Sequence, residues 1–429
     1  DDVFLQLYAT DASIFDLRPL GVVRPRGVKD VVATVQYAQA EGLPIHARGA
    51  GTGLAGESLG PGLVVDFSRS MRRVVAIGED FARIQPGVVH AELNRQLAAS
   101  GRVFGPDPAT SQVTTMGSVI AIDAAGSYWL RYGSARQQVE SLQVVLADGA
   151  VLEVGRESLT AAANAQDGRR EIVGQIAALV SSQEKLIQEH QPRSLVNRCG
   201  YHLSDILNGD SLDLAKLITG SEENVRTEKL PNTRGVALLF FDRLEAAASA
   251  AIQIPDLGAV ACDMMDRRLL SIARETDVRY DDLLPASAEA MLLVEFHGDT
   301  NDEVRVRLED LVSRVQRHDH LAFAAETVID PQDVDFYWQL PRHVVPMLYR
   351  LRGTERPLPF IEDIAVPPDT LPEFLRRLQD TLKHYSITAS LFGHAGHGQL
   401  HIRPFLDLGN PQHKQLVNPL AAEVYDHVF

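Results

Sequence analysis

The chain has 429 residues, 45% of them hydrophobic and 23% charged, which is the composition of a globular protein with two or three domains. Its formal charge of -16 opposes binding to the phosphate backbone of nucleic acid, and its two cysteines are too few for an iron-sulfur cluster or a disulfide framework. The sequence has no apolar run of the roughly 18 to 20 residues that a membrane span needs, so we expect no such span. The small number of cysteines indicates a reducing compartment, and we expect a cytoplasmic protein.

The first part of the chain is predicted to alternate short strands with helices. Residues 28–40 place apolar side chains at helical spacing, and Gly42 follows them as a stop signal. Strands are predicted at 43–49 and 62–68, on either side of a glycine-rich loop. Two further strands and a helix are expected at 72–78, 81–88 and 90–101.

The glycine-rich loop HARGAGTGLAGES, residues 46–58, contains two phosphate-binding patterns, of which at most one can apply. Gly51, Gly53 and Gly56 match the dinucleotide pattern G-x-G-x-x-G, but a proline and two more glycines follow instead of a long helix. The triphosphate pattern fails because Glu57 occupies the lysine position and would repel phosphates. A glycine loop between strands can still present backbone N–H groups to a pyrophosphate. The alternative is a flexible hairpin without a ligand.

The middle of the chain changes character twice. Residues 105–133 are rich in Gly, Pro, Ser, Thr and Ala and too irregular for one core element, and ordered loops of that length usually carry function. A hairpin with an Asp-Gly turn is predicted over 141–155, and a helix over 170–189. After these elements the pattern shifts to longer apolar strands, so we place a domain boundary near Leu230.

The remainder is predicted to form an α+β layer. Two strand–helix units are expected, with strands at 235–241 and 290–298 and helices at 243–253 and 302–316. A helix over 369–385 precedes two strands at 387–393 and 399–407, which a tight turn joins.

That turn and its flanks hold His394, His397 and His401 within eight residues. On the outgoing strand His401 can face back towards His394, and the neighbouring glycines let both imidazoles reach one ion. Nitrogen ligands favour Zn, Mn or Fe over Ca or Mg, so these two histidines are predicted to bind a divalent metal, with zinc expected. Two imidazoles do not complete a metal site, and a carboxylate or substrate oxygen has to come from elsewhere. The alternative is a cluster of surface histidines.

Arginines form a weaker signal shortly before this motif. Arg342, Arg350, Arg352 and Arg356 all lie within residues 341–357. A guanidinium group can bind the carboxylate of an organic acid with two hydrogen bonds, so this segment is a candidate for substrate binding. The alternative is that the arginines are simply solvated.

Several segments of the chain carry a combined signal, in the order RGAGTGLAGES, GPDPATSQVTTMGSVIAIDAAGS, LQVVLADG, CGYHL, TGSE and GHAGHGQLH. In that order they resemble FAD-linked 2-hydroxy-acid dehydrogenases of the vanillyl-alcohol oxidase and p-cresol methylhydroxylase superfamily. The branch that looks most similar holds D-2-hydroxyglutarate dehydrogenase, D-lactate dehydrogenase and the glycolate oxidase flavin subunit. Within it, the chain resembles the flavoprotein part of the long bacterial form that is fused to an iron-sulfur domain.

The resemblance implies an α+β protein with the two-domain FAD-binding fold of that superfamily. Residues 1–230 would form the FAD-binding domain. Residues 231–429 would form a substrate or cap domain with an antiparallel sheet and the metal motif, and its C-terminal helix could fold back onto the first domain. The FAD would be noncovalent, because Thr52 stands where covalently flavinylated relatives carry histidine.

The resemblance also implies roles for individual residues. The FAD pyrophosphate would be wrapped by Arg48, Gly49, Ala50, Gly51, Thr52, Gly53, Leu54, Ala55 and Gly56. The flavin and its ribityl chain would be lined by Pro106, Asp107, Pro108, Thr114, Thr115, Met116, Gly117, Ser118, Ala125 and Gly126, and the TGSE motif would add Ser221 and Glu222. His394 and His401 match the two metal-binding histidines of the dehydrogenases, whereas His397 and Gln399 stand where those enzymes have Asp and Asn within the turn.

The implied reaction is oxidation of a D-2-hydroxy acid to the 2-oxo acid. Arg342 or a neighbouring residue would bind the substrate carboxylate, and His397 is the candidate base or substrate contact. Electrons would leave the flavin through an iron-sulfur domain or an electron-transfer flavoprotein. Any iron-sulfur cluster would have to belong to a further domain or to a partner. Two alternatives are a flavin oxidase or reductase of the same superfamily that uses no metal, and a nonenzymatic nucleotide- or metal-binding module.

Three departures from the family bear on these expectations. The family continues past GSE with GTLG, whereas Glu222 is followed here by ENVRTEKLP. The family's GEHG segment, which supplies a metal-binding glutamate and a candidate base histidine, would lie beyond Phe429. The substrate arginine of the dehydrogenases aligns only approximately, near Pro341 and Arg342, and Ile361 replaces their substrate-binding lysine.

Overall fold

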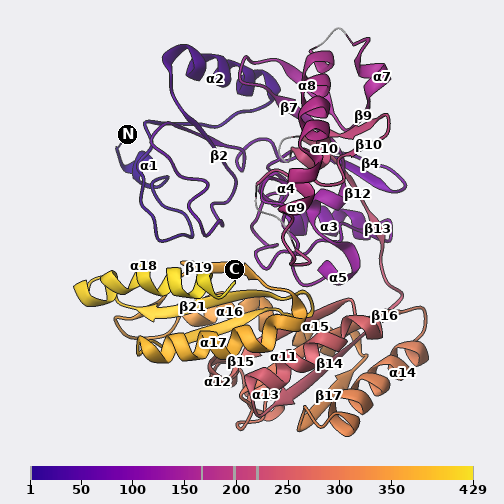
Figure 1. Ribbon diagram of the computed structural model, residues 1–429, viewed down its shortest axis with the longest axis vertical. Coiled ribbons are helices and arrows are strands. Elements are labelled where there is room, and N and C mark those ends of the chain that lie inside the picture. The colour runs from indigo at the N-terminus through magenta and orange to yellow at the C-terminus, as the bar shows by residue number, and fades with distance from the viewer. Residues whose placement is uncertain (1, 166–167, 197–199, 219–221, 429) are drawn as a thin grey trace. The chain divides into compact units, whose positions relative to one another are not determined.

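The computed structural model describes residues 2–165, 168–196, 200–218 and 222–428 (Figure 1). Within them the chain divides into two compact units. The first unit comprises Asp1–Gly126, Tyr132–Pro192 and Asn197–Leu230, and the second comprises Ser127–Arg131, Arg193–Val196 and Pro231–Phe429. A short stretch from the first half of the chain, residues 127–131, therefore belongs to the second unit.

The glycine-rich loop of the first unit connects two strands of a small parallel sheet. Its strands are β1 (Gly21–Val23), β3 (Leu63–Asp66) and β2 (Ile45–Arg48), in that order. The helix α2 (Val28–Glu41) precedes β2 and ends at Gly42, whose φ of 65° is in the left-handed region. Because β2 and β3 pair in parallel, the chain between them is a crossover, and the alternative of a flexible hairpin is wrong.

A second sheet of this unit is antiparallel. Its order is β4 (Val74–Ile77), β5 (Phe81–Ile84), β12 (Glu222–Arg226), β7 (Val139–Val145) and β8 (Val151–Val154). The predicted hairpin over 141–155 corresponds to β7 and β8 and is confirmed. The strand β12 is inserted between β5 and β7, although its sequence EENVR gives no strand signal.

Helices of the first unit pack around this sheet. They include α3 (His90–Ala98), α4 (Met116–Ala121), α8 (Arg169–Ser182) and α9 (Glu184–Glu189). The helix predicted over 170–189 is interrupted at Gln183, and the segment 105–133 contains α4 where irregular chain is predicted. Burial of Met116 and Ile120 explains α4, since packing outweighs weak local propensity.

Short elements complete the first unit. They are α1 (Asp2–Gln6), β6 (Arg102–Val103), α6 (Ala135–Gln138), β9 (Arg156–Ser158), α7 (Leu159–Ala162), β10 (Leu207–Asn208), β11 (Ser211–Asp213), α10 (Leu214–Leu217) and β13 (Glu228–Lys229). The helix α5 (Trp129–Tyr132) spans the point where the chain returns from the second unit to the first.

The second unit is built on a larger antiparallel sheet. Its order is β17 (Ala324–Val328), β14 (Thr233–Phe241), β16 (Ala290–Gly298), β15 (Ala261–Asp266), β20 (Ala389–His394), β21 (Gln399–Leu406) and β18 (Arg356–Pro357), and β19 (Ile361–Ala365) also pairs with β21. The strands predicted at 235–241 and 290–298 and the pair around the histidine turn are confirmed. The strand β15 is not predicted from the sequence.

Helices accompany these strands. They are α11 (Leu244–Gln253), α12 (Arg267–Thr276), α13 (Val278–Leu283), α14 (Asn301–Val312), α15 (Pro331–Tyr337), α16 (Gln339–Tyr349), α17 (Leu371–His384) and α18 (Pro411–Asp426), and a π-helical turn at Ser313–His318 extends α14. Short 3-10 turns lie at Pro255–Leu257, Pro368–Thr370 and Ala395–His397. The C-terminal helix α18 packs against α17, where Thr381 donates to Glu423 at 2.9 Å (Figure 1).

The two faces of this sheet differ in chemistry because successive side chains of a strand point in opposite directions. One face carries apolar residues such as Leu239, Met264, Val294 and Ile402, which form a core with α11, α14 and α17. Alternate positions supply the opposite face with polar side chains, which we call the polar face: Arg234, Asp263, Glu295, His297, Glu362, His394, His401 and Arg403.

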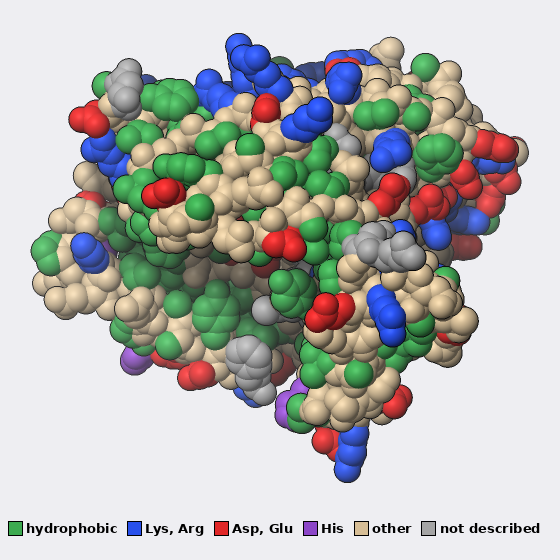
Figure 2. Space-filling model, turned by 90° about the horizontal axis from the view of Figure 1, so that it is seen from above, with side chains coloured by type: hydrophobic (Ala, Val, Ile, Leu, Met, Phe, Trp, Pro, Cys, Tyr) green, Lys and Arg blue, Asp and Glu red, His purple; other side chains and the backbone are tan. Residues whose placement is uncertain are grey.

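The surface is mixed in charge. On the face that Figure 2 shows, acidic and basic side chains lie interspersed among hydrophobic and neutral ones. No helix in the described part of the chain is both long and apolar enough to cross a membrane.

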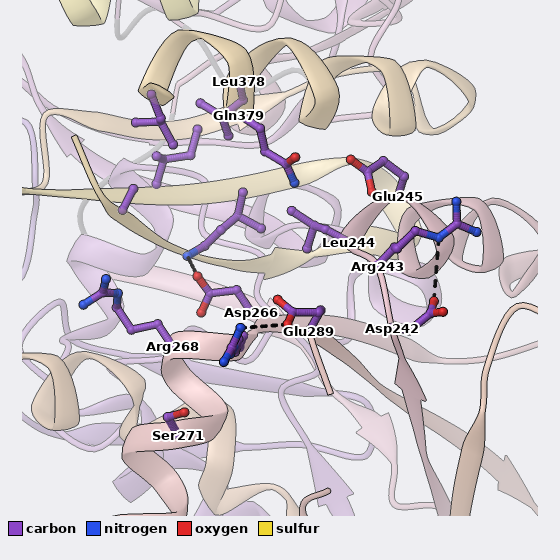
Figure 3. Close-up of a pocket in the computed structure, with 15 residues that line it drawn as sticks. Asp242, Arg243, Leu244, Glu245, Asp266, Arg268, Ser271, Glu289, Leu378 and Gln379 are labelled. Carbon is purple, nitrogen blue, oxygen red and sulfur yellow. Dashed lines mark hydrogen bonds and ion pairs between the residues drawn. The ribbon is translucent and has the colours of Figure 1, made fainter. Parts of the chain in front are cut away.

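Asp266 joins three elements at the end of β15. One of its carboxylate oxygens accepts the N–H of Leu269 at 3.0 Å and caps α12, and the other accepts the N–H of Leu391 on β20 at 2.8 Å. Asp266 lines a cavity of about 720 Å³ (Figure 3). Burial raises the pKa of Asp266 to about 6, although backbone hydrogen bonds and the charge of Arg268 oppose the increase.

Asp266→Asn should therefore change how stability depends on pH. The folded protein retains the Asp266 proton up to about pH 6, and the unfolded chain releases it near pH 3.9, so ionisation penalises the folded state as the pH rises. We expect the asparagine variant to gain roughly 1–2 kcal/mol relative to the wild type between pH 5 and pH 8. Denaturant unfolding at both pH values measures this difference. Asp242→Asn, at an exposed position in the same cavity, is the control, and parallel pH profiles for Asp266→Asn and the wild type would contradict the assignment.

Candidate functional site: a nucleotide cradle and a polar sheet face

In the first unit, the glycine-rich loop approaches α4 closely. A Cβ atom on Gly49 would lie 2.2 Å from Ser118 Oγ and 2.3 Å from Thr115 Oγ1, so a larger residue at this position would force the loop or these side chains to move. The hydroxyl oxygens of Thr52 and Thr114 are 3.5 Å apart. Residues 48–56 and 114–118, both predicted to bind the cofactor, are thereby brought together.

A cavity of about 290 Å³ opens beside this contact. Arg48, Gly49, Thr115, Gly117 and Ser118 are among the residues that line it, and valines of α2 supply apolar wall.

Two buried polar atoms lie at the cavity wall. Arg48 Nη1 and Gln143 Oε1 have no hydrogen-bond partner among the described residues. One is a donor and the other an acceptor, and apolar walls with a few unpaired polar groups are typical of cofactor pockets. The residues present therefore fit a nucleotide cofactor.

The segments predicted to line the flavin also meet each other. Asp107 and Gly126 form an isolated parallel bridge. At Gly126, with φ 91°, a Cβ atom would lie 1.9 Å from the Asp107 carbonyl oxygen. His90 Nε2 lies 2.7 Å from the carbonyl oxygen of Pro106. Ser221 lies outside the described residues, and of Glu222 the structure describes only the backbone, at the start of β12.

Carboxylates on the polar face orient the rings of His394 and His401. His394 Nδ1 lies 2.8 Å from Asp263 Oδ1, and His401 Nδ1 lies 2.8 Å from Glu362 Oε2. A carboxylate at Nδ1 favours the tautomer with the proton on that atom, which leaves Nε2 as the lone-pair donor.

Each orienting carboxylate is itself held by a second group. Ser127 Oγ donates to Asp263 Oδ2 at 2.6 Å, and Arg403 forms an ion pair with Glu362 at 2.6 Å. Burial lowers the pKa of His401, but the hydrogen bond and charge of Glu362 outweigh burial and raise that pKa above its usual value.

The ring centroids of His394 and His401 are 5.9 Å apart. Oriented imidazoles of this kind fit as ligands of a divalent metal. Among the described residues, no group of three or more His, Cys, Asp or Glu is arranged to hold a metal ion, so the pair would need a further ligand.

His397 lies within the same cluster. It is only 1% exposed, and its ring centroid is 4.8 Å from that of Trp129 and 5.4 Å from that of His394. Its Nε2 atom lies 3.3 Å from Gln399 Oε1. The alternative of a surface histidine cluster is therefore wrong.

The predicted arginines lie on α16 and in the chain that follows it. Arg342 is on α16 with its guanidinium carbon 5.9 Å from the Trp338 ring. Arg350 caps the end of that helix, and Arg356 Nη1 donates to the Leu351 carbonyl at 2.8 Å.

Sequence reasoning missed Asp263, Glu295 and Glu362. The signal for Glu295 is present in the strand AMLLVEFHG, where an acid interrupts a run of buried apolar residues. Such a side chain can be buried only with partners.

The chain matches two family models in succession: an FAD binding domain over residues 19–155 and the C-terminal domain of FAD linked oxidases over residues 230–429. D-2-hydroxyglutarate dehydrogenase from Escherichia coli strain K12 is 29% identical over 451 residues, covering 97% of this chain and 44% of that protein. Glycolate oxidase subunit GlcD from Bacillus subtilis strain 168 is 25% identical over 429 residues, covering 98% of this chain and 80% of that subunit. The chain thus spans less than half the length of the first of these relatives.

Among solved structures, alkyldihydroxyacetonephosphate synthase is similar with a TM-score of 0.65 and 16% identity, covering 95% of this chain and 71% of that one. At this identity the likeness concerns the fold alone. The predicted α+β fold of the vanillyl-alcohol oxidase and p-cresol methylhydroxylase type is confirmed. By fold and by the two family matches, the chain belongs to the FAD-linked oxidases.

Glu57 provides a test of the cradle. Its carboxylate turns back into the glycine loop and accepts the N–H of Ala55 at 3.0 Å. There it would compete with the pyrophosphate of FAD for a backbone donor and repel its charge. We expect Glu57→Gln to bind FAD about 3- to 10-fold more tightly than the wild type.

Titration of the cofactor-free protein with FAD, followed by flavin fluorescence, measures this affinity. Glu79→Gln, at an exposed position in the turn between β4 and β5, controls for the general loss of one negative charge. An affinity for FAD in Glu57→Gln equal to that in Glu79→Gln would contradict the assignment of the loop to the cofactor site.

Proposed function

We propose that the chain is the flavoprotein part of a dehydrogenase that oxidises a D-2-hydroxy acid to the corresponding 2-oxo acid. The observation that carries the proposal is the pair of imidazoles on the polar face, each with Nδ1 held by a carboxylate, in a chain of the FAD-linked oxidase family. Relatives named D-2-hydroxyglutarate dehydrogenase support the class of substrate.

The glycine loop from Arg48 to Gly56 would hold the pyrophosphate of noncovalent FAD, and residues 106–108, 114–118 and 125–126 would line the flavin. His394 and His401 would hold a divalent metal, with zinc expected from the nitrogen donors. When bound, FAD supplies a two-electron acceptor for the substrate hydride, and the metal lowers the pKa of the substrate hydroxyl.

Other side chains would bind the substrate and move its proton. Arg342 is the candidate to bind the carboxylate of the acid. His397 is the candidate base. Gln399 Nε2 donates to Asp363 Oδ1 at 2.8 Å, and Gln399 Oε1 lies 3.3 Å from His397 Nε2, so Gln399 would orient the imidazole of His397.

The electron acceptor would be an iron-sulfur domain or an electron-transfer flavoprotein. The chain has only two cysteines, and an iron-sulfur cluster typically needs four cysteine ligands. The greater length of the D-2-hydroxyglutarate dehydrogenases leaves room for such a domain in the whole protein.

Substrate oxidation can be measured directly. Anaerobic addition of D-2-hydroxyglutarate or D-lactate to the FAD-loaded protein should bleach the flavin absorbance at about 450 nm, and the L-enantiomers should do so much more slowly. His394→Ala or His401→Ala should lower the rate about 100-fold, because each would remove a metal ligand.

His318→Ala, at an exposed histidine, is the control for this series. Undiminished bleaching in the His394 and His401 variants would favour a flavin enzyme without a metal. A protein that binds FAD but is reduced by none of the acids would contradict the substrate class.

Metal binding gives an independent prediction. Because Asp263 and Glu362 orient the two imidazoles, Asp263→Asn and Glu362→Gln should each weaken Zn²⁺ binding about 10- to 100-fold. Isothermal titration calorimetry with Zn²⁺ measures this effect, and Glu289→Gln, at a half-exposed ion pair with Arg267, is the control. Wild-type binding no tighter than that of the double variant His394→Ala/His401→Ala would contradict the site.

A further inference from the structure

Glu295 is the most heavily hydrogen-bonded carboxylate described on the polar face. Its side chain is fully buried. Arg234 donates to it from Nε at 2.8 Å and from Nη2 at 3.1 Å, His297 Nε2 lies 2.7 Å away, and Tyr128 OH donates at 3.1 Å. Trp338 Nε1 donates to the same carboxylate. Neither the predicted metal site nor the predicted cofactor cradle uses Glu295.

The donors around Glu295 favour its charged form. Burial alone would raise its pKa, but the hydrogen bond from His297 and the charge of Arg234 outweigh burial and lower the pKa to about 2. A neutral side chain would keep one carbonyl oxygen for donors that now share two carboxylate oxygens, and a buried donor left unsatisfied costs more than the net gain from forming such a bond.

The donors to Glu295 come from segments far apart in the sequence. Arg234 is on β14 and His297 on β16 itself. Trp338 lies between α15 and α16, immediately before the helix that carries Arg342. Tyr128 belongs to residues 127–131, which follow Gly126 directly in the chain.

Contacts of Trp338 and of residues 127–131 extend this connection. The Trp338 ring lies beside the Arg342 guanidinium at 5.9 Å and is 5.3 Å from the Tyr128 ring. Ser127 binds the carboxylate that orients His394, and Trp129 lies against His397.

We propose that Glu295 is a positioning residue for the substrate: its carboxylate fixes Trp338 and Tyr128, and so sets the place of Arg342 at the start of α16. This inference rests on the proposed function for the identity of the substrate. It goes beyond the predicted metal and cofactor residues, since Glu295 touches neither group of residues and acts through the side chains that it orients.

Kinetics of flavin reduction test the proposal. Glu295→Gln should raise the concentration of D-2-hydroxy acid needed for half-maximal flavin reduction about 10-fold or more, with the maximal rate changed less than about 3-fold. Trp338→Phe keeps an aromatic ring, although a smaller one, and removes the N–H that Glu295 accepts, so it should shift the same parameter in the same direction by a smaller factor. Glu289→Gln is the matched control and should leave both parameters unchanged.

Tryptophan fluorescence supplies a readout that needs no substrate. The chain contains two tryptophans, so Trp129→Phe leaves Trp338 as the single emitter. In that background Glu295→Gln should shift the emission maximum of the cofactor-free protein and increase quenching by acrylamide, because the indole loses its anchor. Glu289→Gln in the same background should leave the emission unchanged.

The outcomes separate the proposals. If no D-2-hydroxy acid reduces the wild-type flavin, the proposed function fails, and unchanged Trp338 emission in Glu295→Gln then overturns the anchor as well. If the wild type is reduced, half-saturation equal to that of the wild type in both Glu295→Gln and Trp338→Phe overturns the positioning role, even where thermal stability falls. Should Glu295→Gln fail to fold, the Trp338→Phe kinetics decide.

Discussion

On the polar face, each carboxylate described at hydrogen-bond distance from a histidine is shared between that imidazole and a second donor. Asp263 binds His394 and Ser127, Glu362 binds His401 and Arg403, and Glu295 binds His297 together with Arg234. A lone carboxylate would be too costly to bury at these positions, and a lone imidazole would be free to rotate. Sharing removes both problems, and the arrangement of the site depends on it.

The fold separates this polar chemistry from the core by strand alternation alone. Leu400 and Ile402 of β21 join the apolar core, while His401 between them points to the other side. A shift of one residue in the pairing of β20 with β21 would bury the histidines among leucines. Burial of the apolar face therefore fixes the register of this strand pair, and the positions of the histidines on the polar face depend on that register.

Sequence patterns predicted the elements whose local signals were strong. The long apolar strands β14 and β16, their helices and the histidine turn could be recognised in this way. The strands β12 and β15 could not, because EENVR and ACDMMD are poor strand sequences that pair with neighbours on both sides.

The same limit applies to the site. The spacing of His394 and His401 in the sequence is enough to predict them as a pair of metal ligands. Their carboxylate partners could not be proposed, since Asp263 is 131 residues from His394 and Glu362 is 39 residues from His401. Contacts at such separations arise from sheet order, which composition and periodicity leave open.

Residues 127–131 bear on how this protein can be divided. A family match by sequence assigns them to the FAD binding domain, whereas their side chains complete the hydrogen bonding of the other unit. A fragment that begins after Leu230 would retain Asp263 and Glu295 but would lose the hydroxyl groups of Ser127 and Tyr128, which donate hydrogen bonds to those carboxylates. Chimaeras that exchange the C-terminal half between relatives would also have to exchange residues 127–131. The segments that form the polar face and its hydrogen bonds are therefore not contiguous in the gene.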